Sequence, residues 1–535
     1  MTLLSLWQII TLAKQENCCL RSVQSGRASC AVEARSPRAS RVFAGMETAR
    51  LGDGLPDAGD KQLPRPEGEP LIDDVLVVTV DGKPHWGTPV LRQVVAAAGP
   101  MAAIISSGIT TGFSAVLLPQ LQAPDSTITV TEDEASWIAS IAALPMAPGC
   151  VLGGLLMERL GRRAAHQVVC VPHILGWVLI SVARNVPAIY VGRFLTGLCL
   201  GMNGPLSPVF IAETSGPEFR GVLLAMVSLA VAIGILVGNF LGTVLSWQLA
   251  AAISAVFPLV CYVGVFWVPE SPVWLAARGR HAEATAAFRW YRGCSADVVK
   301  ELTDLLGKHA AERPRQTWAD LWGEVCKMSF LKPFFVMIVF FLVMQCSGVN
   351  AVSFYTVSIL DGVGSGMDSY VATNVIGLVR VVVSAVGCIL TRRFGRRPLA
   401  VISCLGAGAS LLGLGAAGPG WVPLLLLMVY IFFMGIGLVP LPWVMVGEVF
   451  PAAARGLGSG CSSCFCFVVF FAVVKTLPAL AATVGIHGAF YAYGAVALGG
   501  AVFLYAFLPE TRNRTLQDIE DGYSRANNNN NNRLA

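Results

Sequence analysis

The chain has 535 residues, of which 55% are hydrophobic and 13% are charged, and its formal net charge is +5. Soluble globular domains carry about 25% charged residues, so this composition excludes an ordinary soluble domain and predicts side chains in contact with lipid. The positive charge is concentrated in short loops, which argues against a nucleic-acid-binding surface. The 15 cysteines lie mostly in apolar runs and lack the spacing of metal ligands, so no metal and no cofactor are expected.

Residues 1–92 are rich in Arg, Pro, Gly, Ser and Asp without periodicity, which predicts a disordered cytosolic tail. Twelve apolar runs follow, each close to the roughly 20 residues that a membrane-spanning helix needs. They form one group in 93–268 and another in 331–508, separated by a cytosolic linker with short helices at 269–330 and followed by a cytosolic tail at 509–535. The expected spans are 93–118, 135–157, 165–184, 188–211, 222–245, 249–268, 331–359, 370–391, 398–417, 422–446, 458–480 and 487–508.

Both groups of six spans carry the same basic motif at the same place. Arg159-Leu160-Gly161-Arg162-Arg163 follows the second span, and Arg393-Phe394-Gly395-Arg396-Arg397 follows the eighth. Because short loops rich in Lys and Arg remain in the cytosol, both loops and both termini of this multi-pass chain are expected on the cytosolic side. The repeat predicts an all-α membrane protein of two pseudo-symmetric six-helix bundles around a central cavity, with access that alternates as one bundle rocks against the other.

Several motifs occur in the order that is typical of one transporter family. In chain order they are GGLLMERLGRR, Gly192-Arg193, PVFIAETSGPEFRG, VPESPVWLAARGR, QCSGVN, PLPWVMVGEVFPAAARG and PETRNRTLQDIE, and the matches as a whole run from about residue 93 to residue 522. With these motifs the chain resembles the sugar porters of the major facilitator superfamily. GITTGFSAVLLPQL, EASWIAS and VVKTL look like the corresponding segments of arthropod facilitated trehalose transporters and class III facilitative glucose transporters.

The resemblance implies a twelve-helix major facilitator fold and a monomeric transporter in the plasma membrane. It implies facilitated diffusion of trehalose or a hexose, with the sugar and the lipid bilayer as the partners and no enzymatic step. The sequence agrees on this last point, because it has no Gly-rich phosphate loop with its Lys and no nucleophile elbow. The span at 93–118 has no Asp or Glu. Because proton symport requires a membrane-embedded group that titrates, this favours facilitated diffusion over proton coupling.

The cytosolic motifs predict an ionic gate, because acids and arginines at helix ends can pair when the inner side closes and separate when it opens. Alternatively, the arginines only set the topology. Topology accounts for the arginines but not for acids at matched positions in both halves, which favours the gate. The candidate gate residues are Glu158, Arg159, Arg162, Arg163, Arg193, Glu213, Arg220 and Glu270 in the first half, and Arg393, Arg396, Arg397, Glu448, Arg455 and Glu510 in the second.

A sugar is bound by amides that hydrogen-bond its hydroxyls and by aromatic rings against its apolar face. By resemblance, Gln345 and Asn350 of the seventh span are sugar ligands, and Phe354 and Tyr355 are gate aromatics. Trp443 in the tenth span, after two prolines that bend the helix, is the inner aromatic of the cavity. The alternatives are that the amides only join helices and that Trp443 lies in the interfacial belt.

The sequence departs from the family at several of these positions. Met344 replaces the first of two paired glutamines, Ser228 replaces a glutamine of span five, and Cys466-Phe467 replaces an Asn-Trp pair. Arg380 stands where relatives have Asn or Gln, and a charge there costs about 3 kcal/mol unless it faces water or a partner. We expect Arg380 to face the cavity and not to snorkel to the membrane surface. Two other functions therefore stay open, a non-transporting sugar receptor and a porter of a non-sugar, anionic solute.

Overall fold

The structure is a computed structural model of the chain. It describes residues 88–124, 126, 128–293, 296–310, 323, 325–364, 366–450 and 454–511, without the side chains of 296, 297, 304, 308–310, 392 and 455. The predicted N-terminal tail up to residue 87, and the predicted C-terminal tail from residue 512, lie outside the described residues. The first helix begins at Pro89, so the last residues of the predicted tail, 89–92, belong to the first span instead.

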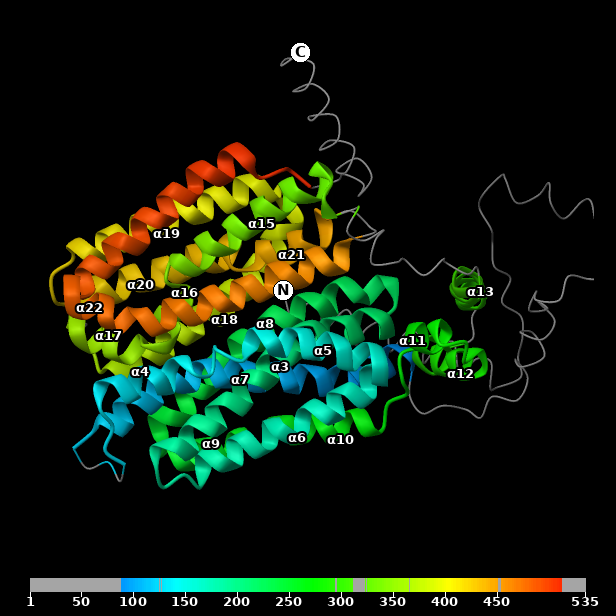
Figure 1. Ribbon diagram of the computed structural model, residues 1–535, viewed down its shortest axis with the longest axis horizontal. Helices are drawn as coiled ribbons and strands as arrows, with labels where there is room; N and C mark the ends of the chain where they lie inside the picture. Colours follow the sequence, from blue (N-terminus) through cyan, green and yellow to red (C-terminus); the bar gives the residue numbers. More distant parts are fainter. Residues whose placement is uncertain are drawn as a thin grey trace, which may run out of the picture. The chain divides into compact units, whose positions relative to one another are not determined.

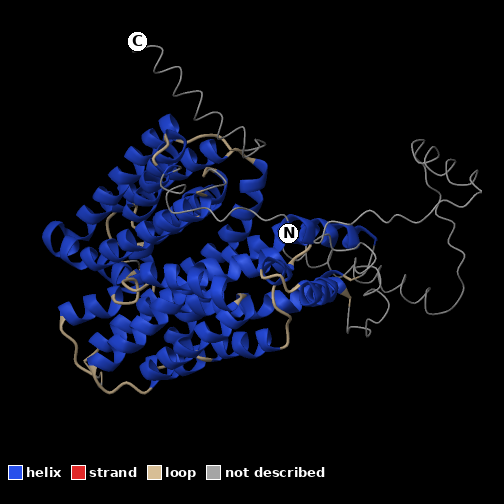
Figure 2. Ribbon diagram, turned by 45° about the vertical axis from the view of Figure 1, so that its right-hand side comes forward, coloured by secondary structure: helices blue, strands red, loops and turns tan. Residues whose placement is uncertain are grey.

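The described residues are helical and contain no strand, as expected for an all-α membrane protein (Figure 2). Figure 1 shows two groups of long helices, α3 to α10 in blue to green and α15 to α22 in green to red. The helices of the first group, the N-bundle, are α3 (Pro89–Gln122), α4 (Glu132–Ser140), α5 (Met146–Leu160), α6 (Arg162–Ser181), α7 (Val186–Thr214), α8 (Pro217–Val244), α9 (Trp247–Ser254) and α10 (Val256–Phe266).

The second group, the C-bundle, is built in the same way and includes one π-helical turn, η2. Its elements are α15 (Met328–Cys346), α16 (Val349–Phe354), α17 (Thr356–Val363), α18 (Ser369–Arg393), α19 (Arg396–Ala416), α20 (Trp421–Phe433), η2 (Met434–Leu438), α21 (Pro440–Glu448) and α22 (Arg455–Phe507).

Ten helical segments of the described residues are long and apolar enough to cross a membrane. One of them, α22, is interrupted by non-helical backbone at Gly485 and therefore contains two spans. A further span is divided between α4 and α5 by the turn at 141–145, so that neither piece is long enough alone. All twelve predicted spans are thus present, with ends that differ from the predicted ones by a few residues.

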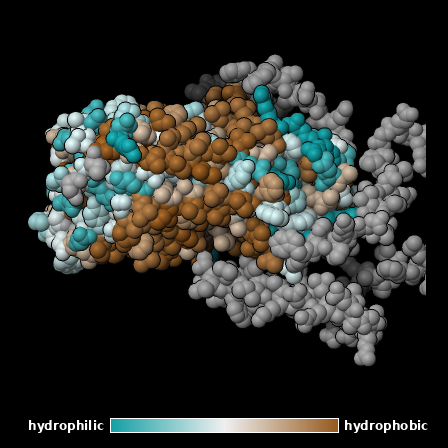
Figure 3. Space-filling view, turned by 90° about the horizontal axis from the view of Figure 1, so that it is seen from below, coloured by the Kyte–Doolittle hydropathy of each residue, from teal (hydrophilic) through white to brown (hydrophobic). Residues whose placement is uncertain are grey.

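The surface of the bundles matches a membrane environment. Figure 3 shows a band of hydrophobic residues on one face of the molecule, with hydrophilic residues on either side of the band. Large apolar side chains such as Phe240, Val260, Val468 and Val502 are more than half exposed in the absence of lipid. Exposed apolar side chains on helices whose backbone groups are satisfied internally are what a bilayer core requires.

Three short helices lie between the two bundles in the chain: α11 (Pro272–Ala277), α12 (His281–Arg292) and α13 (Ala296–Ala310). Helix α12 is fixed to α3 through Tyr291, whose carbonyl oxygen accepts a hydrogen bond from Gln93 Nε2 at 3.1 Å. The Tyr291 hydroxyl donates to the carbonyl oxygen of Pro269 at 2.6 Å. Burial raises the pKa of Tyr291 well above its usual value, so the phenol remains a neutral donor.

The two bundles pack against each other along three lines of contact. Helix α5 packs against α22, α8 against α18, and α3 against α16 and α17. One hydrophobic cluster includes Phe113 of α3 and Phe354 of α16, so the apolar core is continuous from one bundle to the other. Side chains at these three lines are therefore placed where rocking of the bundles would change their contacts.

Candidate functional site

At the N-bundle's basic loop, a carboxylate closes the start of helix α6. We call the end of the bundles that carries the two basic loops the basic end. Glu270 Oε1 accepts hydrogen bonds from the backbone N–H of Arg162 at 2.9 Å and of Arg163 at 3.1 Å, and from Ser271 N at 2.7 Å. The free N–H groups and dipole of a helix N-terminus favour an anion at this place. Gly161 leaves room for this carboxylate, because a Cβ there would lie 2.4 Å from Glu270 Oε2.

The C-bundle repeats this arrangement at the start of helix α19. Glu510 accepts from the backbone N–H of Arg396 at 3.0 Å and of Arg397 at 3.2 Å. A Cβ at Gly395 would lie 2.4 Å from Glu510 Oε2. The glycine of the repeated motif is thus explained in both halves by the space that a carboxylate needs beside a helix start.

The first arginine after each of these glycines forms an ion pair with the end of a neighbouring span. Arg162 Nη2 lies 2.7 Å from Glu213 Oε1 at the end of α7, and Arg396 Nη2 lies 3.1 Å from Glu448 Oε1 at the end of α21. The second carboxylate oxygen accepts a hydroxyl in both cases. Ser271 Oγ donates to Glu213 Oε2 at 2.5 Å, and Thr511 Oγ1 donates to Glu448 Oε2 at 2.6 Å.

The second arginine after each glycine, Arg163 or Arg397, contacts the end of a neighbouring span. Arg163 Nη2 donates to the carbonyl oxygen of Phe266 at 2.9 Å and its guanidinium lies 5.7 Å from the centre of that ring. Arg397 donates to the carbonyl oxygen of Tyr505 and lies 5.0 Å from its ring. The predicted gate residues at these positions therefore form two matching clusters. Each ion pair joins helices of one bundle, instead of joining the two bundles to each other.

Arg193 lies outside these clusters, and its assignment to the gate is wrong. It is fully buried in α7 near the opposite end of the N-bundle. Its Nη1 donates to the carbonyl oxygen of Thr110 at 2.9 Å, and Nη2 donates to Ser114 Oγ. Its Nε donates to the carbonyl oxygen of Ile138 at 3.3 Å. The error arose because the span that carries Arg193 starts at the end opposite to the basic loops.

Other predicted gate residues make weaker or different contacts. The Glu158 carboxylate is exposed, and its carbonyl oxygen accepts from Trp274 Nε1 at 2.9 Å and from Arg278 Nη2 at 2.7 Å. The carbonyl oxygen of Arg159 accepts from Arg278 at 3.4 Å. The predicted pairing of Glu158 with a neighbouring arginine is therefore corrected to these carbonyl contacts.

Three further arginines complete the predicted gate. Arg220 donates to the carbonyl oxygen of Ser215 at 3.4 Å instead of binding an acid, and Arg393 is exposed. The side chain of Arg455 lies outside the described residues. Within the predicted gate, side-chain contacts with the ends of neighbouring spans are therefore made by the arginines that directly follow the two glycines.

At the opposite end, an ion pair joins the two bundles. Lys475 Nζ of α22 lies 3.3 Å from Asp133 Oδ1 of α4 and 4.1 Å from the centre of the Trp137 ring. Trp137 in turn lies 6.4 Å from Phe471, measured between ring centres. The bundles are therefore in contact at the end away from the basic loops.

The seventh span is broken, and the break brings two predicted ligands together. Helix α15 ends at Cys346, Gly348 has a φ of +82°, and α16 starts at Val349. Asn350 Nδ2 donates to Gln345 Oε1 at 2.7 Å. Gln345 Nε2 donates to Cys466 Sγ of α22 at 3.1 Å. Gln345 is buried, whereas Asn350 is half-buried, so Asn350 is the more accessible of the two amides.

Arg380 of α18 points to the same broken span. Its Nη2 donates to Ser353 Oγ of α16 at 2.7 Å, and the residue as a whole is half-buried. Tyr430 of α20 donates its hydroxyl to the carbonyl oxygen of Ser347 at 2.7 Å, at the break itself. Arg380 therefore has a neutral hydroxyl partner inside the C-bundle.

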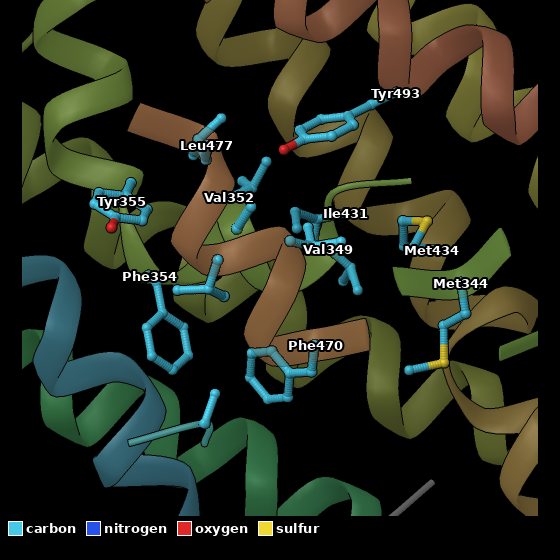
Figure 4. Packing of buried hydrophobic residues seen from close by; sticks show 14 of the residues in the cluster. Met344, Val349, Val352, Phe354, Tyr355, Ile431, Met434, Phe470, Leu477 and Tyr493 are labelled. Atoms are coloured by element: carbon cyan, nitrogen blue, oxygen red, sulfur yellow. The ribbon is translucent and has the colours of Figure 1, made fainter. Parts of the chain in front are cut away.

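The predicted aromatics fall into two groups. Phe354 is fully buried and Tyr355 nearly so, and Figure 4 shows them within the apolar cluster, with Phe470 facing Phe354. Phe354 and Phe470 meet edge to face at 5.5 Å. Trp443 is 42% exposed and lies on Phe341 and Phe467 at 5.1 and 5.9 Å. Trp443 is thus an accessible ring fixed by two others, whereas Phe354 and Tyr355 are packed.

Of the substituted positions, Met344 is buried in the apolar cluster (Figure 4), so a thioether fills space at that place. Ser228 is exposed on α8, the helix of the N-bundle that packs against α18. The α-helical pattern of the tenth span is interrupted next to its two prolines: the π-helical turn η2 ends at Leu438, just before Pro440 and Pro442.

Several functional contacts were missed at the sequence level. They involve the hydroxyls of Ser271 and Thr511, the thiol of Cys466, the hydroxyl of Ser353 and the ammonium of Lys475. For the hydroxyls of Ser271 and Thr511 a signal existed, since VPES and LPET occupy matching places in the two halves.

A cavity of about 400 Å³ lies at the basic end, away from the predicted sugar ligands. It is lined by Arg397, Pro398, Val401, Ile402 and Tyr505.

The family model described as "Sugar (and other) transporter" matches residues 94–523. A facilitated trehalose transporter of Drosophila yakuba is 36% identical over 466 residues, which cover 83% of this chain and 54% of the relative. A facilitated trehalose transporter homologue of Drosophila sechellia is 36% identical over 442 residues, 80% of this chain and 90% of the relative. The chain spans about half the length of the first of these relatives.

Among solved structures, the inward open conformation of the xylose transporter XylE from E. coli is similar, with a TM-score of 0.66 and 22% sequence identity. The match covers 81% of this chain and 99% of that chain, and it concerns the fold. The family model, the relatives at more than a third identity and the twelve-span architecture agree. The chain therefore belongs to the sugar transporter family of the major facilitator superfamily.

Proposed function

We propose that this chain is a facilitative sugar transporter of the plasma membrane that carries trehalose or a hexose by alternating access. The observation that carries this proposal is the broken seventh span, which holds the amide pair Gln345–Asn350 beside the interface of the two bundles. The half-buried amide of Asn350 and the exposed ring of Trp443 offer the two kinds of contact that a sugar needs. The trehalose transporters named above support trehalose as the first sugar to test.

The proposed membrane topology places the basic end and both termini in the cytosol. In that orientation the Lys475–Asp133 contact closes the outer side, and the two basic-end clusters are paired within their own bundles. Alternating access then requires α4 and α22 to separate at Lys475 while the bundles approach each other at the basic end. The ionic clusters at the two glycine motifs would act as rigid caps of the moving helix ends.

Uniport is favoured by the surroundings of Arg193. This arginine is a fully buried charge of the N-bundle that lies against the first span, and its partners are two carbonyl oxygens and the hydroxyl of Ser114. None of these partners titrates in the physiological range. Helix α3 has no Asp or Glu along its whole length from Pro89 to Gln122, so the arginine has no carboxylate in that helix with which to exchange a proton.

The test is uptake of radiolabelled trehalose, glucose and fructose into proteoliposomes that contain the full-length chain. Uniport predicts saturable uptake that is equal with and without an imposed proton gradient. Asn350→Ala is expected to lower uptake about tenfold or more, because the amide loses its hydrogen bonds to the sugar. Gln248→Ala, an amide at the start of α9, is the matched control and keeps uptake. Binding of sugar without flux would favour a receptor, and gradient-driven accumulation would overturn uniport.

A second candidate, transport of an anionic solute, is favoured by Arg380. A guanidinium with a single neutral hydroxyl partner retains donors for a carboxylate. If the solute is anionic, glucuronate competes with uptake more strongly than glucose, and Arg380→Gln removes that preference. If the solute is a neutral sugar, glucose is the stronger competitor in both forms of the protein.

A further inference from the structure

Two cysteines from different bundles lie side by side at the interface of α5 and α22. The thiols of Cys150 in α5 and Cys464 in α22 are neighbours. Cys464 Sγ also donates to the carbonyl oxygen of Ala147 in α5 at 3.5 Å. The contact with Ala147 holds the Cys464 side chain against the N-bundle, one helical turn from Cys150, although the two cysteines are 314 positions apart along the chain.

A second thiol pair has the opposite character and serves as a comparison. Cys170 of α6 and Cys261 of α10 are also neighbours and lie in one buried cluster, but both belong to the N-bundle. Cys170 is 2% exposed and Cys261 is fully buried. A bond between those two would join helices that stay together in every conformation, and the packed core keeps reagents from their sulfurs.

The thiol pair between the bundles is less deeply buried than the pair inside the N-bundle. Cys464 is half-buried, and Cys461, one helical turn closer to the basic end of α22, is exposed. Cys150 is 9% exposed and lies directly behind Cys464. A small uncharged oxidant that reaches Cys461 can therefore also reach Cys464, and from there the reaction passes to Cys150 without entry of further reagent.

We propose that Cys150 and Cys464 form a reversible disulfide that locks the two bundles together and stops transport. With hydrogen peroxide as the oxidant, the Cys464 thiol becomes a sulfenic acid and one water is released. The Cys150 sulfur then attacks the Cys464 sulfur, the S–S bond forms, and the sulfenic oxygen leaves with two protons as a second water. A dithiol reductant reverses the reaction by thiol–disulfide exchange.

The lock follows from the geometry of a disulfide and rests on the proposed alternating access. A disulfide keeps its two Cα atoms about 4.4–6.8 Å apart, so α5 and α22 could no longer separate at this point. The same two chain segments meet again at the Lys475–Asp133 contact, since α4 and α5 form one span. With the bundles joined at Cys464, α4 and α22 cannot separate at the Lys475–Asp133 contact, and the chain stays in the conformation seen here. Disulfides that form in a reducing compartment are transient and regulatory.

The first arm of the test detects the bond itself and does not depend on any substrate. Full-length protein in membranes is treated with hydrogen peroxide, remaining thiols are blocked, and the digested peptides are identified by mass spectrometry without reduction. The expected product is a peptide pair that joins Cys150 to Cys464 and disappears after dithiothreitol. A protein fully oxidised at Cys461 that gives no such pair would overturn the proposal, even if sugar uptake is never observed.

The second arm measures function in proteoliposomes. Peroxide is expected to lower sugar uptake at least about fivefold, because a cross-linked transporter cannot complete its cycle, and dithiothreitol is expected to restore it. Cys464→Ser and Cys150→Ser should be transport-competent and insensitive to peroxide. The matched control Cys261→Ser, which disrupts the pair inside the N-bundle, should remain as sensitive as the unmodified chain. Equal inhibition of Cys464→Ser would refute the lock.

Discussion

Replacing Gly161 by alanine tests the carboxylate-capped loop most directly. The new Cβ would lie 2.4 Å from Glu270 Oε2, so the carboxylate must move away from the start of α6. Gly161 also has φ +95° and ψ 170°, a backbone conformation that is essentially restricted to glycine and costs other residues on the order of 1–3 kcal/mol. The variant Gly161→Ala therefore suffers from two separate penalties.

The matched variant Gly395→Ala suffers from only one of them. Its Cβ would lie equally close to Glu510 Oε2, but Gly395 has φ −65° and ψ 151°, which alanine adopts freely. Loss of a hydrogen bond to a charged group costs about 1.5–3 kcal/mol. We therefore expect destabilisation by about 1.5–3 kcal/mol for Gly395→Ala, and by about 2.5–6 kcal/mol for Gly161→Ala when the backbone cost is added.

Thermal unfolding of the purified protein in detergent, followed by tryptophan fluorescence, measures this order. The unfolding midpoint should fall for both variants and fall further for Gly161→Ala. In the double variant Gly161→Ala with Glu270→Ala, the steric part of the penalty disappears, so the two changes should cost less together than their sum. Equal midpoints for Gly161→Ala and Gly395→Ala, or additive effects in the double variant, would refute the reasoning.

Two further predictions concern single contacts. Lys475→Ala should lower the unfolding midpoint more than Asp133→Ala. Both variants lose an exposed ion pair, which contributes only about 0–1 kcal/mol, but Lys475→Ala also loses the contact of the ammonium with the ring of Trp137. Equal effects would mean that the ring contact is unimportant. Ser271→Ala should destabilise the chain by about 1.5–3 kcal/mol, because the acid at the end of α7 loses a hydroxyl donor. Ser254→Ala, which loses only a bond within its own helix, should be milder, and the same thermal assay compares the two.

The candidate substrate site was predictable only in part. Gln345, Asn350 and Trp443 could be placed from sequence motifs, and the structure brings the two amides within hydrogen-bond distance of each other. The further partner of Gln345 could not be placed, because Cys466 reaches it from another helix. A thiol in an apolar run has the sequence pattern of a packing residue, and only the contact with Gln345 shows otherwise.

The sequence by itself determined the number and order of the spans, the short helices of the linker and the internal repeat. These features depend on local hydrophobicity and on motifs of a few residues, which can be identified one segment at a time. The acids and arginines of the two matching clusters were also identified in this way, since they occur at equivalent places in both halves.

Only the tertiary structure decided which charged groups meet. Arg193 was grouped with the gate, yet packing buries it among carbonyl oxygens at the other end of its bundle. The carboxylate of Glu270 binds backbone N–H groups, and the pairing of Cys150 with Cys464 crosses the two bundles. Such contacts depend on how each helix is rotated about its axis and which neighbour it packs against, and these properties arise from interactions between segments far apart in the chain.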